Sequence, residues 1–198
     1  MEDYVYILDF LPQGRPDAPP SRREPTLLGV GDQQFTLFEL VPRSGISFTI
    51  GDRAYIGKDV EQRELIQKIR GRITYQELTP SAHGELPYVI EDIIDADPQR
   101  FVKFFNDAPP ISVRFHALEL LPGVGKKSVE HVVQERKKGP FKDFDDLEER
   151  AGIQHPKRVV VQRIVKEIQD PTEKYHIFVR PPQKEDDRWG GPRPPMRR

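Results

Sequence analysis

Apolar residues come in short runs separated by turn residues over roughly the first sixty positions. Tyr4–Phe10 is rich in β-branched and aromatic residues and is followed by Pro12, as is typical of a strand. Further runs of the same kind are Leu27–Val30, Phe35–Val41, Phe48–Ile50 and Ala54–Ile56. Short strands at this spacing, with Gly-Asp pairs between them, predict a small β-barrel over residues 1–79.

The apolar spacing then becomes helical. Leu65, Ile66 and Ile69 fit one helical face, and a longer apolar stripe runs from Leu86 to Ile94. Asp97 followed by Pro98 is typical of a helix start. We therefore expect helices to dominate residues 80–170, which makes the fold class α+β, with a barrel followed by an all-helical domain.

The C-terminal part divides into two segments. Tyr175–Val179 has strand character, so residues 171–182 are predicted to contain a strand that returns to the barrel. Residues 183–198 are rich in proline, glycine and arginine, which predicts a disordered tail.

The most informative segment is Leu121-Pro122-Gly123-Val124-Gly125-Lys126-Lys127-Ser128. We expect an apolar helix end with Phe115, Leu118 and Leu121 to enter it and a valine-faced helix to leave it. Glycines permit left-handed backbone angles and leave peptide N–H groups uncovered, and a helix start adds further N–H groups. With Lys126, Lys127 and the Ser128 hydroxyl, such a turn suits a phosphate group.

Together with the Gly139-Pro140-Phe141 that follows, this segment resembles a helix–hairpin–helix motif over residues 112–138. A weaker copy spans residues 144–169, in which Gln154 stands where the second glycine is expected and Pro156 removes one N–H group. The second copy is therefore expected to pack against the first and to bind phosphate poorly. Its Lys157 and Arg158 remain candidate backbone contacts.

Charge limits the size of any anion-binding surface. The 198 residues include 31 Lys+Arg and 32 Asp+Glu, for a net charge of -1. Residues 1–115 carry 13 basic and 18 acidic groups (-5), and residues 116–198 carry 18 and 14 (+4). The segment from Lys126 to Lys142 contains six basic residues and only two acidic ones, Glu130 and Glu135. A small local contact is therefore expected in place of broad electrostatic wrapping.

Several chemistries lack support in the sequence. The chain has no cysteine, which excludes disulfides, thiolate metal sites and cysteine nucleophiles. The histidines, His116 and His131 among them, lack paired metal-ligand spacing, and no GxxxxGK[ST] phosphate loop occurs. Acidic clusters near Glu91–Asp97 and Asp143–Glu149 fit solvated faces and helix caps better than a two-metal nuclease. No enzyme activity, metal or cofactor is predicted.

The barrel offers a second candidate surface. Barrels that bind single strands stack bases on aromatic side chains beside basic groups. Arg53, Tyr55 and Lys58 are the candidates for such contacts. The acidic start and the lack of a long apolar run predict neither a signal peptide nor a membrane span, so we expect a cytoplasmic protein.

A strand-rich front unit followed by helices and a helix–hairpin–helix region resembles the archaeal family called domain of unknown function 655. The resemblance covers the chain except its tail and implies nucleic-acid binding with an oligonucleotide/oligosaccharide-binding (OB) type barrel. It implies no activity. The leading hypothesis is a non-enzymatic protein that contacts the backbone of DNA or RNA without sequence preference. The alternative is a protein-interaction adaptor that uses the hairpins structurally, and a metal-dependent nuclease ranks last.

Overall fold

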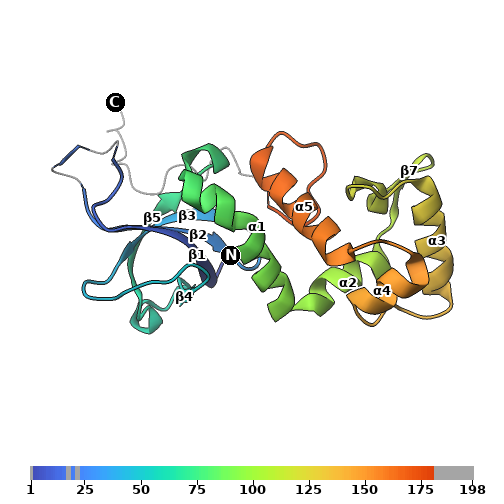
Figure 1. Cartoon of the computed structure of the whole chain (residues 1–198), viewed down its shortest axis with the longest axis horizontal. Helices are drawn as coiled ribbons and strands as arrows, with labels where there is room; N and C mark the ends of the chain where they lie inside the picture. Colours follow the sequence, from blue (N-terminus) through green and yellow to red (C-terminus); the bar gives the residue numbers. More distant parts are fainter. Residues whose placement is uncertain (1, 17–18, 21–22, 181–198) are drawn as a thin grey trace, which may run out of the picture. The chain divides into compact units, whose positions relative to one another are not determined.

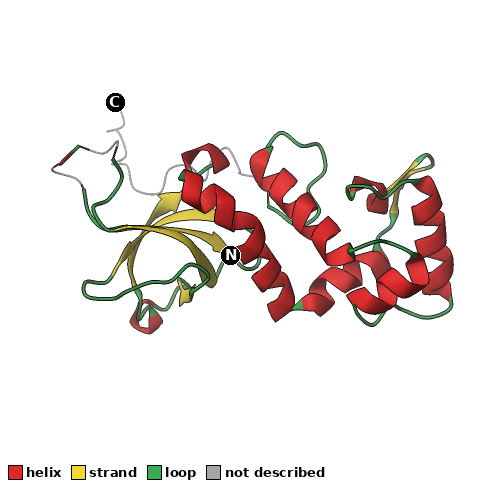
Figure 2. Cartoon of the chain, in the orientation of Figure 1, coloured by secondary structure: helices red, strands yellow, loops and turns green. Residues whose placement is uncertain are grey.

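The computed structural model describes residues 2–16, 19–20 and 23–180, and the fold class is α+β, as predicted (Figures 1 and 2). The described elements of the front part are β1 (Tyr4–Leu11), β2 (Thr26–Gly31), β3 (Leu37–Pro42), β4 (Arg53–Tyr55), η2 (Val60–Gln62), β5 (Ile66–Arg72) and η3 (Tyr75–Glu77). Those that follow are α1 (Pro80–Ala96), α2 (Pro98–Asp107), β6 (Pro110–Ser112), β7 (Phe115–His116), η4 (Ala117–Leu120), α3 (Lys126–Lys137), α4 (Phe144–Ala151) and α5 (Pro156–Gln169).

The chain forms two units that divide within α1. The first comprises the described residues up to Val89 together with those from Ile168 onward, and the second runs from Ile90 to Glu167. The predicted boundary between residues 79 and 80 thus differs from the observed one. Among the described residues, no helix has the length and apolar character that a membrane span requires.

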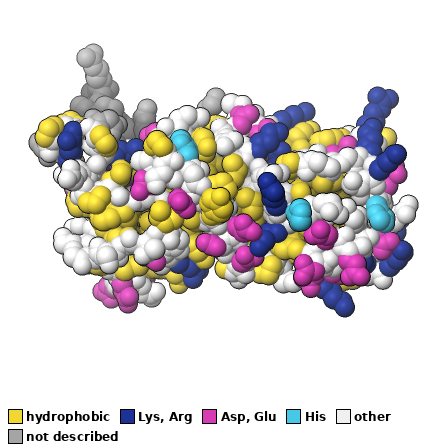
Figure 3. All heavy atoms as spheres, in the orientation of Figure 1, with side chains coloured by type: hydrophobic (Ala, Val, Ile, Leu, Met, Phe, Trp, Pro, Cys, Tyr) yellow, Lys and Arg dark blue, Asp and Glu magenta, His cyan; other side chains and the backbone are white. Residues whose placement is uncertain are grey.

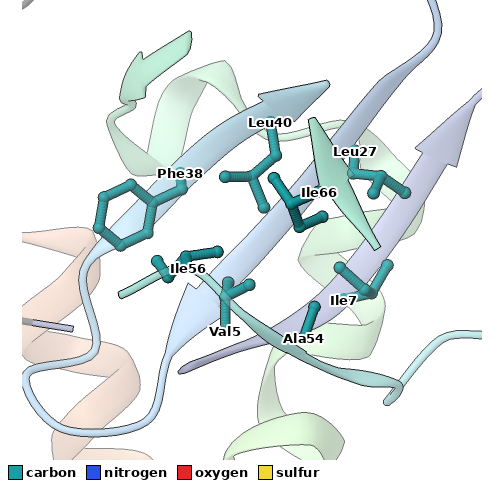
Figure 4. Packing of buried hydrophobic residues seen from close by; sticks show 8 residues of the cluster. All are labelled: Val5, Ile7, Leu27, Phe38, Leu40, Ala54, Ile56 and Ile66. Atoms are coloured by element: carbon teal, nitrogen blue, oxygen red, sulfur yellow. The ribbon is translucent and has the colours of Figure 1, made fainter. Parts of the chain in front are cut away.

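The first unit contains a curled antiparallel sheet with strand order β4-β1-β2-β3-β5. One core cluster of this unit contains eight buried side chains, which Figure 4 shows lying close together: Val5, Ile7, Leu27, Phe38, Leu40, Ala54, Ile56 and Ile66. Tyr4 pairs with Tyr55 and Tyr6 with Arg53, one register step from the core pair Val5 and Ala54. Because successive side chains of a strand alternate between faces, Arg53 and Tyr55 lie on the face opposite this core.

The predicted helix over Leu65–Ile69 is wrong, because β5 begins at Ile66 and contains Ile69. In its register with β3, Ile69 pairs with Leu40 and Ile66 with Pro42, so one extra residue is inserted between them. A β-bulge of this kind turns two apolar residues three positions apart to the same face. Ile66 is buried in the core and Ile69 packs against it. Apolar residues at helical spacing over five positions can therefore belong to a bulged strand as well as to a helix.

Two further strand predictions fail. Phe48–Ile50 forms an irregular segment, although Phe48 still packs beside Phe10 with ring centroids 5.7 Å apart. The described residues 171–180 form turns and bends in place of the expected strand, and Arg180 N–H donates to the Gln34 carbonyl at 3.2 Å. Residues 181–182 and the predicted tail at 183–198 lie outside the described residues.

The helical expectation for the second unit holds in its main elements. Asp97 caps α2 by accepting a hydrogen bond from Arg100 N–H, and Phe101, Val102 and Phe105 face the core. Before α3, however, the chain makes the short hairpin β6–β7, and Val113 at its tip is fully exposed. The predicted entry helix is therefore only the 3₁₀ turn η4.

A capping box and a proline explain why η4 is short. The side chains of His116 and Glu119 close the capping box at its start. Pro122 disfavours helical angles at the preceding residue, and Leu121 is extended, with φ -76° and ψ 134°. The turn thus ends at Leu120.

Candidate functional site

The turn between η4 and α3 depends on its glycines. Gly123 has φ +76°, a left-handed angle that side chains other than glycine rarely adopt. Val124 N–H then donates to the Leu121 carbonyl at 3.2 Å, and Gly125, which is extended, precedes α3. A Cβ atom added to Gly123 or Gly125 would meet nothing within 4 Å, so the surface above both residues is open.

Buried side chains hold this turn in place on its inner side. Leu118, Leu121 and Val124 are 0%, 2% and 7% exposed, and Val129 and Val132 continue the apolar contact along α3. The alternation of buried side chains with exposed glycines therefore fixes the backbone while keeping its outer side accessible.

Positive charge gathers at the start of α3. The first N–H groups of a helix have no partner within it, and no side chain caps α3 at Gly125. Lys126 and Lys127 are exposed and form no ion pair with the described residues, while Ser128 is half-buried. In Figure 3, basic side chains stand out at the corner where Figure 1 labels β7 and α3. The turn combines open amides, a helix N-terminus and two free cations.

At the other end of α3, several basic groups make internal contacts. Arg136 donates to the carbonyls of Phe105 (3.2 Å) and Ala108 (3.0 Å), and Lys138 pairs with Glu135. Arg150 of α4 donates to the carbonyls of Glu135 and Gly139, both at 2.8 Å. Lys137 and Lys142, by contrast, are exposed and form no ion pair with the described residues, so the basic surplus between residues 126 and 142 is shared between the two ends of α3.

Asp146 makes the junction between α3 and α4 sensitive to acid. Its pKa is lowered because its carboxylate accepts a hydrogen bond from Lys142 N–H at 2.9 Å and one from Arg150 at 3.0 Å. The stability it contributes is therefore present above the ordinary aspartate pKa and is lost as pH falls through the lowered one. We expect Asp146→Asn to destabilise the protein at pH 7 and to matter less at about pH 3. Urea unfolding at both pH values checks this, and an equal effect at both would contradict it.

The second predicted hairpin lacks the geometry of the first. Gly152 ends α4 with φ +69°, but His155 precedes α5 and Pro156 occupies its first position without an N–H group. A Cβ atom on Gly152 would lie 3.9 Å from the Nδ1 atom of His131, so this turn faces α3. These features fit the expected packing role.

The two basic candidates of the second hairpin, Lys157 and Arg158, differ in whether they form ion pairs. Lys157 forms ion pairs of 3.1 Å with both Glu91 and Asp95 of α1, and the hydrogen bond to Asp95 raises its pKa. The ammonium group of Lys157 is therefore already paired with two carboxylates, and its contact with a nucleic-acid backbone stays a prediction. Arg158 is exposed and forms no ion pair with the residues that the structure describes.

The barrel candidates also differ from one another. The Arg53 guanidinium lies 3.5 Å from the centroid of the Tyr4 ring and pairs with Asp32 at 3.0 Å. Tyr55 contacts the same Tyr4 ring edge-on, with centroids 5.3 Å apart. Lys58 is exposed. Arg53 and Tyr55 thus share one aromatic cluster with Tyr4. Tyr4 was not among the contact residues predicted from the sequence.

The histidines and acidic groups of the second unit serve local structure. The ring of His116 accepts a hydrogen bond from Leu118 N–H, and burial lowers its pKa. His131 lies 4.0 Å from Glu135, and Asp143 caps α4 through Asp146 N–H. Across residues 2–16, 19–20 and 23–180, no three histidine or acidic side chains cluster as a metal site requires.

Sequence reasoning missed a charged pair in the core. Arg163 and Glu167 of α5 are 1% and 0% exposed, and Arg163 also donates to the Leu120 carbonyl just before the turn. The signal was present, because these residues occupy the same helical stripe as the buried Val160, Ile164 and Ile168.

Comparison with known proteins identifies one family and two similar proteins. The sequence model of one family, described as "Protein of unknown function (DUF655)", matches residues 1–180. "Uncharacterized protein MJ0038" of Methanocaldococcus jannaschii is 42% identical over 180 residues, covering 90% of this chain and 80% of the relative. The crystal structure of Af1531 from Archaeoglobus fulgidus, assigned to the same family, superposes with a TM-score of 0.83 at 48% identity, covering 90% of this chain and all of that one. The chain belongs to the family described as protein of unknown function DUF655.

Proposed function

We propose that the protein binds the sugar-phosphate backbone of nucleic acid, without sequence preference, through the turn Gly123–Ser128. The observation that carries this is the open glycine turn at the start of α3, where uncapped amides meet the unpaired Lys126 and Lys127. Phosphate oxygens accept hydrogen bonds from such amides, and the lysines add charge without reading bases. The protein acts by binding and catalyses no reaction.

The finer architecture fits this proposal. The turn acts as a shortened helix–hairpin–helix in which η4 replaces the first helix. The curled sheet is OB-like in its five antiparallel strands and partial closure. The cluster of Tyr4, Arg53 and Tyr55 supplies an auxiliary contact for an unpaired base.

The direct test is the affinity for single-stranded and duplex DNA and RNA of one length, measured by fluorescence anisotropy against salt concentration. We expect similar affinity across sequences and a logarithmic salt slope equivalent to about two to three phosphates. Binding that is absent at low salt would reject the function and favour the adaptor alternative.

The paired state of Lys157 yields a sharper prediction. Lys157→Ala is expected to leave the salt slope unchanged, because Glu91 and Asp95 already neutralise this ammonium group. Lys127→Ala removes an unpaired charge at the turn and is expected to reduce the slope by about one. The two variants carry the same charge change, so equal slopes for both would contradict the placement of the site.

A further inference from the structure

Arg163 and Glu167 form a buried ion pair that the stability of the core does not require. Arg163 Nε lies 2.7 Å from a Glu167 carboxylate oxygen, and both side chains are almost completely buried. Removing two charges from water is costly, and well-packed apolar side chains often stabilise a core equally well. A purely stabilising role therefore explains this pair poorly.

A second contact of Arg163 leads to the turn. Its Nη1 atom donates to the Leu120 carbonyl at 3.2 Å. The N–H group of the same peptide unit, which belongs to Leu121, donates to the Leu118 carbonyl at 3.1 Å. Both ends of one peptide plane are thus held, and a planar peptide bond with both ends fixed has one orientation.

The next hydrogen bond connects this peptide unit to the turn. The Leu121 carbonyl accepts a hydrogen bond of 3.2 Å from Val124 N–H, which closes the backbone around Gly123. Glu167 holds the guanidinium by its Nε edge, which leaves Nη1 directed at Leu120. A continuous series of bonds therefore runs from α5 to the residues before α3.

We propose that Arg163 is a positioning residue that sets the direction of the backbone presenting the amides of Gly123–Ser128. As far as it concerns phosphate, the inference rests on the proposed function. The contact to Leu120 is a structural property that can be tested separately.

The test uses R163K in the full chain, with Q162M as a matched control on the exposed side of α5. Lysine retains the charge next to Glu167 but lacks the planar group that reaches a second acceptor. We expect amide hydrogen exchange at Leu121 and Val124 to accelerate about tenfold, with exchange at Val132 and Ile164 unchanged. Oligonucleotide affinity should fall about tenfold at an unchanged salt slope, because both lysines remain.

A second variant guards against general unfolding. R163M/E167L removes both charges together and should produce the same local acceleration, whereas Q162M should leave it at the wild-type rate. Unchanged exchange at Leu121 and Val124, or unchanged affinity, in a folded R163K protein overturns the proposal. If the wild-type protein binds no oligonucleotide, the proposed function fails, and the exchange rates alone decide the positioning role.

Discussion

Replacing Lys126 and Lys127 together with glutamate should lower oligonucleotide affinity at least about hundredfold at low salt and reduce the logarithmic salt slope by about two. Both side chains are exposed and unpaired within the described structure, and they stand beside the uncapped amides of α3. Glutamate removes two cations and places two anions where a phosphate group would dock. The loss should be uniform across sequences, because backbone contacts read no bases.

Lys137→Glu plus Lys138→Glu is the matched control. It makes the same charge change on the same helix, at the end where Lys138 already pairs with Glu135. We expect only a small loss of affinity, since the site lies at the other end of α3. Equal losses in the two double variants would show that binding follows overall charge and would contradict a site at the turn.

Glu167→Leu should destabilise the protein by about 3–5 kcal/mol, the largest stability effect that we expect from one substitution. The change leaves the Arg163 guanidinium in the core without the carboxylate that it contacts at 2.7 Å. Urea unfolding, followed by circular dichroism, measures the change in the free energy of unfolding.

The double variant Arg163→Met plus Glu167→Leu provides the contrast. It replaces both charges with apolar groups and should recover most of the stability lost by Glu167→Leu, since no uncompensated charge remains. If Glu167→Leu alone were as stable as the wild-type protein, Arg163 would have to find water or another acceptor, and the pair would not be a buried charge unit.

The sequence predicted those features that depend on neighbouring residues. Asp97 and Pro98 start α2 as expected, and Gly123 adopts the left-handed angle that its turn requires. The strands β1 and β2 followed from short apolar runs bounded by turn residues. In each case the physical cause lies within a few positions of the chain.

Features that depend on distant partners could not be predicted. The bulge that brings Ile66 and Ile69 to one face exists only in the register with β3. Lys157 looked available because its partners, Glu91 and Asp95, lie more than sixty positions away. The 3₁₀ turn before α3 is an intermediate case, because Pro122 indicated an early end that the apolar stripe of Leu118 and Leu121 concealed.

The β6–β7 tip makes this chain convenient for single-point labelling. The protein contains no cysteine, and Val113 projects entirely into solvent. A Val113→Cys variant would carry one reactive thiol, on a side chain whose replacement disturbs no packing. A fluorophore or spin label attached there would report on the second unit alone, with no background signal to remove.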